Sequence, residues 1–586
     1  MTIRRARALL RFSVGSITTM ALFACAQLNP AAEDPVMRIS VLAFNDLHGN
    51  LEPPLLSIRE QVHQVSTAVP AGGIAYMASA IQQLKVQNPL NAVVSAGDMI
   101  GATPLISALF LDEPTIEAVN AIGIDFNAVG NHEFDKGVAE LERMRRGGCA
   151  QFTRLKPCLV NPAFPGANFE FLAANVKKEN GQTLFPPYGI KVFKQGGHEV
   201  KVGFVGMTLQ GTPLIVTPSG VKGVRFESEA QTANALVPLL KAQGVSALVL
   251  VIHEGGTVQG GPNDPTCPGL TGDLLPILDQ LDPAFDVVVS GHTHRAYACD
   301  YQKFNPAKPF LLTSAGQYGT LLTHIELQVD ALQRKVTRKS AHNLIIQSEA
   351  FTNAAGVRIA TTPGLPQFSP YPEVARIVAT YKAASAEQAA RQISRLPQSI
   401  TRAGTPSGET ALGNLIADAQ WAATAPADKG GSDFALMNPG GVRADLILPP
   451  GGAVSYGQLF SIQPFGNTLT VKTFTGLLVK ELLESQYRQD RPRVLYPSAQ
   501  LTYQVDLKQP VGQRVSDIRI KGQSLQPHAN YRVTMNSFLA TGGDAFSVFN
   551  RGTDVLGGDL DVDALTDYLA KNPGLMPPTT DRIRLY

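Results

Sequence analysis

Residues 126–133 read Phe-Asn-Ala-Val-Gly-Asn-His-Glu, an apolar run that ends in a glycine followed by amide, imidazole and carboxylate side chains. A short apolar run bounded by glycine predicts a buried strand. Four more apolar runs, residues 39–44, 92–95, 247–252 and 287–290, also close on Asp, Asn or His side chains, with a glycine beside most of them. They lead to Asp46 and His48, to Asp98, to His253, and to His292 and His294. Helix-like segments at 74–86 and 230–242 alternate with such runs, which is the pattern of an α/β domain. Sites in α/β proteins lie outside the carboxyl ends of the strands, so we predict that these endings form one site.

The distribution of histidine along the chain supports this prediction. Of the ten histidines, five lie in these strand endings, namely His48, His132, His253, His292 and His294. A single histidine after a strand is ordinarily a hydrogen-bonded turn residue, and a single aspartate there is ordinarily a helix cap. Turn residues and caps would be scattered, whereas these side chains are concentrated. We therefore interpret them as a set of metal ligands.

The types of ligand indicate the metal and the reaction. Mixed carboxylate, imidazole and amide donors suit Mn, Zn, Co or Fe, whereas an all-oxygen set would suit Ca or Mg and thiolates would indicate structural zinc. Six or seven donors are too many for one tetrahedral ion but sufficient for two divalent metal ions about 3.5–4 Å apart. Such a pair activates water as a hydroxide for attack at phosphorus and stabilises both the attacking and leaving oxygens. The predicted reaction is hydrolysis of a phosphate ester.

The order of these motifs resembles the calcineurin-like metallophosphoesterases. The extension Asn131-His132-Glu133-Phe134-Asp135, together with the C-terminal part, narrows the resemblance to the secreted 5'-nucleotidase family. The resemblance implies an α/β fold, with an N-terminal four-layer αββα metallophosphoesterase domain and a C-terminal α/β 5'-nucleotidase substrate-binding domain. It also implies that Asp46, His48 and His294 hold one metal, that Asn131, His253 and His292 hold the other, and that Asp98 bridges them. Some relatives carry an amide in place of His294, so metal preference is expected to differ more than mechanism.

His132 and Asp135 are the expected catalytic residues. They lie three apart at a predicted helix start, so both side chains can face one side, with the carboxylate orienting the imidazole. In the family this pair stabilises the transition state and assists the leaving group. Read without the resemblance, His132 has an alternative role, in which it forms a hydrogen bond to a metal ligand and does not contact the substrate.

Three glycine-rich segments of the C-terminal part could contact a nucleotide: 438–443, 463–467 and 536–544. Read without the resemblance, Phe465 and Phe538 are more readily core residues. The resemblance implies instead that these two rings stack on a base, that Asp544 binds ribose, and that Asn438 and Arg443 face the nucleotide. Relatives carry a further substrate-binding arginine where this chain reads Thr405-Pro406-Ser407-Gly408. Either Arg402 replaces it from a shifted position or the phosphate is bound more weakly, so strict specificity for 5'-monophosphates is not implied.

The 586-residue chain is long enough for two large domains. We expect a signal peptide at 1–35, the metallophosphoesterase domain at 36–345, a linker and connecting helix at 346–395, and the 5'-nucleotidase domain at 396–586. The connecting helix is predicted over 373–395. The net charge of +2 gives no overall field for a nucleic-acid polymer, so none is expected as a partner. The oligomeric state is left open.

The N-terminus indicates export. Four arginines precede the apolar stretch 12–24, as in a secretory signal. Cys25 is either the lipidated residue of a bacterial lipoprotein, which would anchor the protein to a membrane, or part of an ordinary Ala-Cys-Ala cleavage site. The other four cysteines would then pair in an oxidising compartment, Cys149 with Cys158 and Cys267 with Cys299 by proximity, although three pairings are possible. The expected location is the bacterial periplasm or cell envelope.

The leading hypothesis is therefore an exported dinuclear-metal 5'-nucleotidase that releases phosphate from nucleotides. Within the same class, a 2',3'-cyclic-nucleotide 2'-phosphodiesterase/3'-nucleotidase or a nucleotide-sugar hydrolase would use the same metals. The alternative from another class is an inactive nucleotide-binding surface lipoprotein. The complete ligand set argues against it, because a pure binder has no need of both His132 and Asp135.

Overall fold

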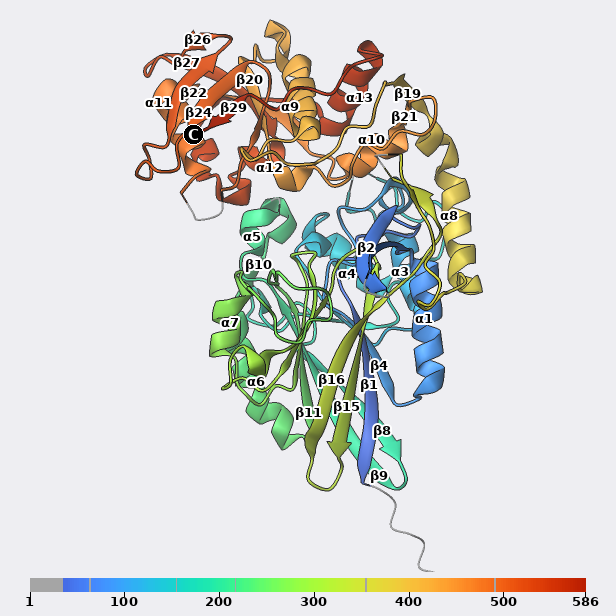
Figure 1. Ribbon diagram of the computed structural model, residues 1–586. Helices are drawn as coiled ribbons and strands as arrows, with labels where there is room; N and C mark the ends of the chain where they lie inside the picture. Colours follow the sequence, from blue (N-terminus) through green and yellow to red (C-terminus); the bar gives the residue numbers. More distant parts are fainter. Residues whose placement is uncertain (1–34, 63–64, 154, 217, 354–355, 489–491) are drawn as a thin grey trace, which may run out of the picture.

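The computed structural model describes residues 35–62, 65–153, 155–216, 218–353, 356–488 and 492–586 (Figure 1). The predicted signal, with Cys25, lies outside these residues apart from position 35. An N-terminal part carries the elements from β1 (Val36–Phe44) to β16 (Lys335–Ile345), and a C-terminal part carries those from β19 (Gln392–Arg395) to β29 (Ile583–Leu585). None of the helices in the described ranges is both long and apolar enough to span a bilayer.

Two six-stranded sheets form the N-terminal part. The first has the order β16-β15-β1-β4-β5-β6, and the second has the order β13-β14-β12-β11-β9-β8. The remaining bounds are β15 Leu321–Asp330, β4 Asn91–Ser95, β5 Phe126–Ala128, β6 Glu170–Leu172, β13 Ala296–Asp300, β14 Leu311–Ala315, β12 Val287–Ser290, β11 Ala247–His253, β9 His198–Thr208 and β8 Tyr188–Gln195. The five strands predicted from the sequence are all present, and within each sheet they are parallel neighbours.

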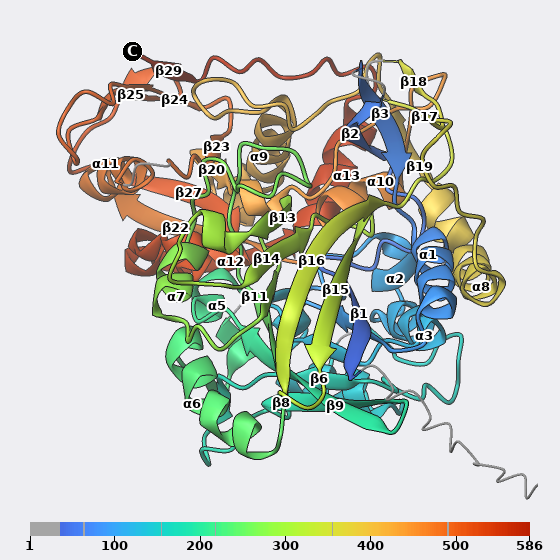
Figure 2. The ribbon, with the colours of Figure 1, turned by 60° about the horizontal axis from the view of Figure 1, so that its bottom comes forward.

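The sheets pack face to face with helices outside each. Along β1, Val41 and Ala43 point into the core between the sheets, whereas Leu42 and Phe44 point into the core under α1 (Ile74–Gln87) and α3 (Glu113–Ile122). The outer face of the second sheet packs on α6 (Glu229–Ala242) and α7 (Leu274–Gln280). Figures 1 and 2 show the two helix groups on opposite flanks. This alternation confirms the four-layer αββα prediction.

The long helix α8 (Pro372–Ala390) connects the two parts. It contacts α1, α2 (Leu105–Ala108) and α3 on one side and α10 (Tyr456–Ile462) on the other. The prediction of a helix as far as residue 395 is wrong at its end. Residues 392–395 form β19 instead, because pairing with β21 (Ala453–Ser455) buries Ser394. The domain boundaries expected from the sequence stay predictions.

The C-terminal part is also α/β, as predicted. Its five-stranded sheet has the order β23-β20-β27-β22-β28, and its four-stranded sheet has the order β26-β25-β24-β29. The bounds are β20 Phe434–Met437, β22 Thr468–Thr475, β23 Tyr496–Pro497, β24 Leu501–Val505, β25 Val515–Ile520, β26 Gln523–Ser524, β27 Asn530–Asn536 and β28 Thr553–Leu560. The helices α9 (Ala411–Thr424), α11 (Gly476–Ser485) and α13 (Asp561–Lys571) pack around these sheets. The pocket segments predicted from the sequence follow β20 and β27 and precede β22.

Both disulfides inferred by proximity are present. Cys149 is bonded to Cys158, and Cys267 is bonded to Cys299. The second disulfide joins the loop after β11 to strand β13 and encloses His292 and His294. It therefore fixes the segment that carries two of the predicted ligands.

Candidate active site

The predicted metal ligands converge where the carboxyl ends of the two sheets meet. The loops after β1 and β4 are joined by main-chain hydrogen bonds from Asp46 to Gly97 (3.0 Å) and from His48 to Asp98 (2.9 Å). The loop after β12 is held to the first sheet by the His292 amide, which donates to Asp46 Oδ2 at 2.9 Å. Each sheet thus contributes donors to one crevice.

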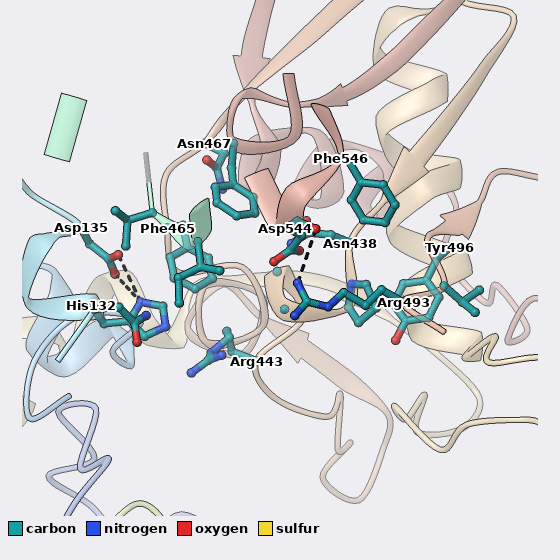
Figure 3. Close-up of a pocket in the computed structure, with 18 of the residues that line it drawn as sticks. His132, Asp135, Asn438, Arg443, Phe465, Asn467, Arg493, Tyr496, Asp544 and Phe546 are labelled. Atoms are coloured by element: carbon teal, nitrogen blue, oxygen red, sulfur yellow. Dashed lines mark hydrogen bonds and ion pairs between the residues drawn. The ribbon is translucent and has the colours of Figure 1, made fainter. Parts of the chain in front are cut away.

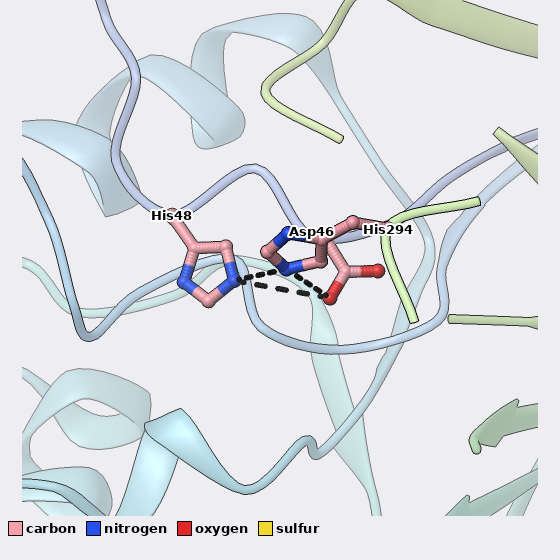
Figure 4. Close-up of side chains that lie close together, drawn as sticks. All are labelled: Asp46, His48 and His294. Carbon is pink, nitrogen blue, oxygen red and sulfur yellow. Dashed lines mark hydrogen bonds and ion pairs between the residues drawn. The ribbon is translucent and has the colours of Figure 1, made fainter. Parts of the chain in front are cut away.

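Asp46, His48 and His294 form the first cluster (Figure 4). The Nε2 atoms of the two imidazoles are 3.1 Å apart, and Asp46 Oδ1 lies 3.8 Å from His48 Nε2 and 3.3 Å from His294 Nε2. Asp46 Oδ1 is buried and accepts no hydrogen bond from the described residues. A buried carboxylate oxygen facing two imidazole nitrogens is the arrangement expected around a shared cation.

Asp98, His253 and His292 form the second cluster. Asp98 Oδ2 lies 3.0 Å from His253 Nε2 and also 3.6 Å from His48 Nε2 in the first cluster. Asn131 Oδ1 lies 3.1 Å from His253 Nε2. The structure therefore brings all seven predicted ligands together and places Asp98 between the two groups.

The tautomers of two histidines fit metal binding. His48 Nδ1 donates to the Gly101 oxygen at 2.8 Å, and His253 Nδ1 donates to the Ala96 oxygen at 2.6 Å. Because a carbonyl oxygen only accepts, each Nδ1 carries a proton, and each Nε2 faces its cluster as the nitrogen that would ligate a metal ion in place of a proton. These donors fit two divalent cations.

The backbone at the ligands is strained. Five of them have positive φ: Asp46 (50°), His48 (45°), Asp98 (51°), His292 (68°) and His294 (57°). Side chains other than glycine rarely adopt this conformation, and clusters of such residues mark functional sites. Gly130 shows how closely the loops approach, because a Cβ there would lie 2.2 Å from Asp98 Oδ1.

The charges of the crevice favour added positive charge. Burial raises the pKa of Asp46, but His294 and His253 outweigh burial and bring that pKa to about 2. Burial lowers the pKa of His292 to about 3, which leaves its imidazole neutral and able to ligate. Burial also opposes protonation of His253, yet Asp98 and Asp46 raise its pKa to about 10. The carboxylates thus stabilise a cation beside His253, whether a proton or a metal ion.

His132 and Asp135 are paired as predicted. His132 lies in a single 3-10 turn (His132–Phe134), and its Nδ1 lies 2.9 and 3.1 Å from the two Asp135 oxygens. Burial lowers the pKa of His132, but Asp135 and Asp98 outweigh burial, so the net shift is upward. The imidazole is therefore held as a proton donor beside the clusters.

One cavity of about 540 Å³ connects the metal clusters to the C-terminal part (Figure 3). Its N-terminal wall includes Asn131, His132, Asp135 and His292. Its C-terminal wall contains five of the six residues predicted to bind substrate, Asn438, Arg443, Phe465, Phe538 and Asp544. The structure thus places the predicted catalytic pair and the predicted substrate residues around a single space.

Contacts across the cavity join the two parts of the chain. Arg443 Nη2 lies 3.4 Å from His48 Nε2. The Phe465 ring stacks on the His132 ring, with centroids 5.5 Å apart. Within the C-terminal wall, Asn438 Nδ2 donates to Asp544 Oδ2 at 2.8 Å. Arg443 therefore marks the metal end of the cavity, and Asp544 lies in the C-terminal wall.

Arg402 does not line this cavity. Its guanidinium contacts Asp445 at 3.2 Å and the Val442 main-chain oxygen at 3.4 Å. An exposed partner carboxylate satisfies it outside the pocket, which is why nearness to the 405–408 turn in sequence does not bring it to the cavity.

The sequence did not predict Arg493, Tyr496 and Phe546 as pocket residues, but all three line the cavity (Figure 3). Tyr496 begins a two-residue strand, and Phe546 follows the Gly542-Gly543-Asp544 turn. The aromatic residue two positions after Asp544 was the available signal. Arg493 follows no glycine-rich turn, and only the fold shows its place.

Family models match both parts of the chain. The model described as calcineurin-like phosphoesterase matches residues 39–296, and the model described as 5'-nucleotidase, C-terminal domain, matches residues 382–551. Fold and donor set together define a metal-dependent phosphoester hydrolase that uses two divalent metals. The chain belongs to the 5'-nucleotidase family of calcineurin-like metallophosphoesterases.

Individual relatives extend over most of the chain. It is 28% identical over 538 residues to endonuclease YhcR of Bacillus subtilis, covering 91% of this chain but only 39% of YhcR. It is 25% identical over 589 residues to a 5'-nucleotidase of Vibrio cholerae, covering 96% of this chain and 95% of that protein. The crystal structure of a 5'-nucleotidase precursor from Thermus thermophilus has a TM-score of 0.71 at 24% identity, covering 94% of this chain and 99% of that one, and shows the same fold.

Proposed function

We propose that this protein is an exported 5'-nucleotidase that hydrolyses the phosphate ester of nucleotides with two divalent metal ions. The observation that carries the proposal is the shared cavity. Two donor clusters, a His132–Asp135 pair and a wall with aromatic rings and guanidinium groups surround a space of about 540 Å³, within the range of small-molecule pockets. The relative from Vibrio cholerae bears the same name.

Asp46, His48 and His294 would hold one ion, Asn131, His253 and His292 the other, and Asp98 both. When bound, such ions lower the pKa of water and compensate charge on the phosphoryl group. His132, kept protonated by Asp135, donates to a phosphoryl oxygen or to the departing alkoxide. Arg443 directs its guanidinium at the same end and neutralises phosphate charge. Phe465 and Phe538 would stack on the base, and Asp544 would accept from ribose.

Export is supported by the two disulfides, since such bonds persist in oxidising compartments. The N-terminal signal is part of the same proposal, with Cys25 either lipidated or part of an ordinary Ala-Cys-Ala cleavage site. Mass spectrometry of the mature protein tests them, because a lipidated N-terminal cysteine and a simple cleavage give different masses.

The activity is tested by phosphate release with Mn or Zn from AMP, UMP, ATP, a nucleotide sugar, 2',3'-cyclic AMP and 3'-AMP. Nucleotide sugar and cyclic substrate are assayed with added phosphatase. We expect the 5'-nucleotides to be hydrolysed fastest and His132→Ala to lower kcat by about 10²- to 10⁴-fold. His528→Ala, at an exposed histidine of the C-terminal part, is the matched control and should retain activity.

Other substrates would change the conclusion in defined ways. Preference for the cyclic or 3'-substrate would replace the 5'-nucleotidase assignment and keep the mechanism. Absence of release with every metal and substrate would favour a nucleotide-binding lipoprotein without activity.

A further inference from the structure

Arg493 brings a second guanidinium to the wall of the cavity. Figure 3 shows its side chain extending from beside Tyr496 to Asp544. Among the described residues its guanidinium makes one long hydrogen bond, 3.5 Å, from Nη1 to the main-chain oxygen of Asp544. Arginine has five N–H donors, so most of the hydrogen-bonding capacity remains for a ligand in the cavity.

The segment that carries Arg493 is anchored on both sides. The Arg493 amide donates to the Gln486 main-chain oxygen at 3.1 Å, and the Leu495 amide donates to Gln486 Oε1 at 2.6 Å. Gln486 is buried at the end of α11. Between these bonds Val494 is buried against Gly408, where a Cβ would lie only 2.8 Å from it. The guanidinium thus projects from a fixed stretch of backbone.

Asp544 presents a hydrogen-bond acceptor at the same place. Its backbone is left-handed (φ 56°), and its Oδ2 accepts from Asn438 Nδ2 at 2.8 Å. Asn438 is itself held by Asn536, whose Nδ2 donates to Asn438 Oδ1 at 2.9 Å. Burial raises the pKa of Asp544, whereas Asn438 and Arg493 act in the opposite direction and favour the carboxylate. Arg493 therefore supplies a charge that helps Asp544 stay an acceptor.

An acceptor and a donor side by side fit a hydroxyl group. A hydroxyl donates to a carboxylate and accepts from a guanidinium, so it satisfies both. A second phosphate would meet the Asp544 charge, and a methylene would leave both groups unpaired. Arg443, at the metal end beside His48, is the guanidinium placed to meet phosphate.

We propose that Arg493 is a specificity-determining residue that binds the ribose hydroxyls of the nucleotide together with Asp544. This inference rests on the proposed function. It assigns to the pocket a preference for ribonucleotides over nucleotides that lack a 2'- or 3'-hydroxyl. It also assigns the second substrate-binding cation of this chain to Arg493 rather than to Arg402.

The experiment compares kcat/KM for AMP, 2'-deoxy-AMP, 3'-deoxy-AMP and p-nitrophenyl phosphate in the metal-loaded full chain. The variants are Arg493→Gln and Arg493→Lys, with Arg551→Gln as a matched control at an exposed arginine paired with Glu481. We expect wild type to prefer AMP over at least one deoxy substrate by about tenfold or more, since a hydroxyl paired with charged groups is lost.

Arg493→Gln should reduce that preference by about tenfold, through KM for AMP, and leave p-nitrophenyl phosphate and the deoxy substrate nearly unchanged. Arg493→Lys should keep part of the preference, and Arg551→Gln all of it. A ratio of AMP to deoxy substrate that is equal in wild type and Arg493→Gln would overturn the inference. Wild type that hydrolyses p-nitrophenyl phosphate but not AMP would overturn the proposed function as well, so the two failures are distinguishable.

Discussion

Asp112 shows how a single buried carboxylate supports the site without touching it. It accepts hydrogen bonds from Thr103 Oγ1 (2.6 Å) and Ser107 Oγ (2.8 Å) and pairs with Lys136 Nζ at 2.6 Å. The Gly101 amide donates to its second oxygen at 3.3 Å, and the Gly101 oxygen accepts from His48. Asp112 therefore holds the loop that orients the imidazole of His48, a predicted metal ligand.

We predict that Asp112→Asn lowers the free energy of unfolding by about 1–3 kcal/mol at neutral pH, because charged hydrogen bonds are lost. Burial raises the pKa of Asp112, but Lys136, Thr103 and Ser107 outweigh burial and lower it. A lowered folded-state pKa means that the stabilisation is complete above about pH 4 and is lost as pH falls through that pKa. Urea denaturation of both proteins across this range measures the difference.

Asp445→Asn is the matched control for this prediction. Asp445 pairs with Arg402 at the surface, where ion pairs contribute little, and its replacement should change stability by less than about 1 kcal/mol. An Asp112→Asn protein as stable as wild type at neutral pH would contradict the role assigned to the network.

The N-terminal site could be predicted from the sequence because its residues directly follow strands that the sequence reveals. Apolar runs such as 126–129 are read directly from the sequence, and the carboxyl ends of parallel strands must share one edge. The sequence alone did not show that β1, β4 and β5 lie in one sheet and β11 and β12 in another. That division depends on which face of each buried strand packs where, and strands buried on both faces carry no alternation to reveal it.

Because both sheets supply donors, bound metals would tie them together. His48, Asp46, Asp98 and Asn131 follow strands of the first sheet, and His253, His292 and His294 belong to the second. Ions that bind only the folded state stabilise it by about 2.7 kcal/mol at a hundredfold excess over Kd. We predict that chelation lowers the Tm by about 5 °C, measured by circular dichroism.

Added Mn or Zn should restore the original transition in the same sample. Elemental analysis confirms that the chelated protein has lost its metal. An unchanged Tm in metal-free protein would show that the clusters do not couple the sheets.

The N-terminal and C-terminal parts of the chain each contribute one wall of a single cavity. Phe538 lines the C-terminal wall, and its ring packs on Gly543, where a Cβ would lie 2.5 Å from the ring. We predict that Phe538→Ala raises KM for AMP about tenfold, since stacking on a base contributes about 1–3 kcal/mol. Turnover of p-nitrophenyl phosphate, which has no base, should stay within about twofold in steady-state assays.

Phe152→Ala, at an exposed ring of the N-terminal part, is the control and should leave both substrates unaffected. An equal loss for AMP and p-nitrophenyl phosphate would show that Phe538 supports the fold rather than a base.

The sequence could not predict which residues of the N-terminal part contact which residues of the C-terminal part. Phe465 and His132 are stacked although 333 positions separate them, and that distance is closed by tertiary packing alone. The resemblance supplied both residues but not their contact. Arg402 and Arg493 illustrate the same limit. Arg402 is nearer in sequence to residues 405–408 but pairs with Asp445, whereas the more distant Arg493 lines the cavity.

The seven predicted metal ligands all precede residue 295, whereas the predicted substrate residues Arg443, Phe465, Phe538 and Asp544 all follow residue 437. Inherited changes can therefore reach the two sets separately. Under selection for a new substrate, substitutions can accumulate in the C-terminal part while the predicted metal ligands stay unchanged. We expect natural variants of this chain to differ in the nucleotides that they accept long before they differ in the reaction that they catalyse.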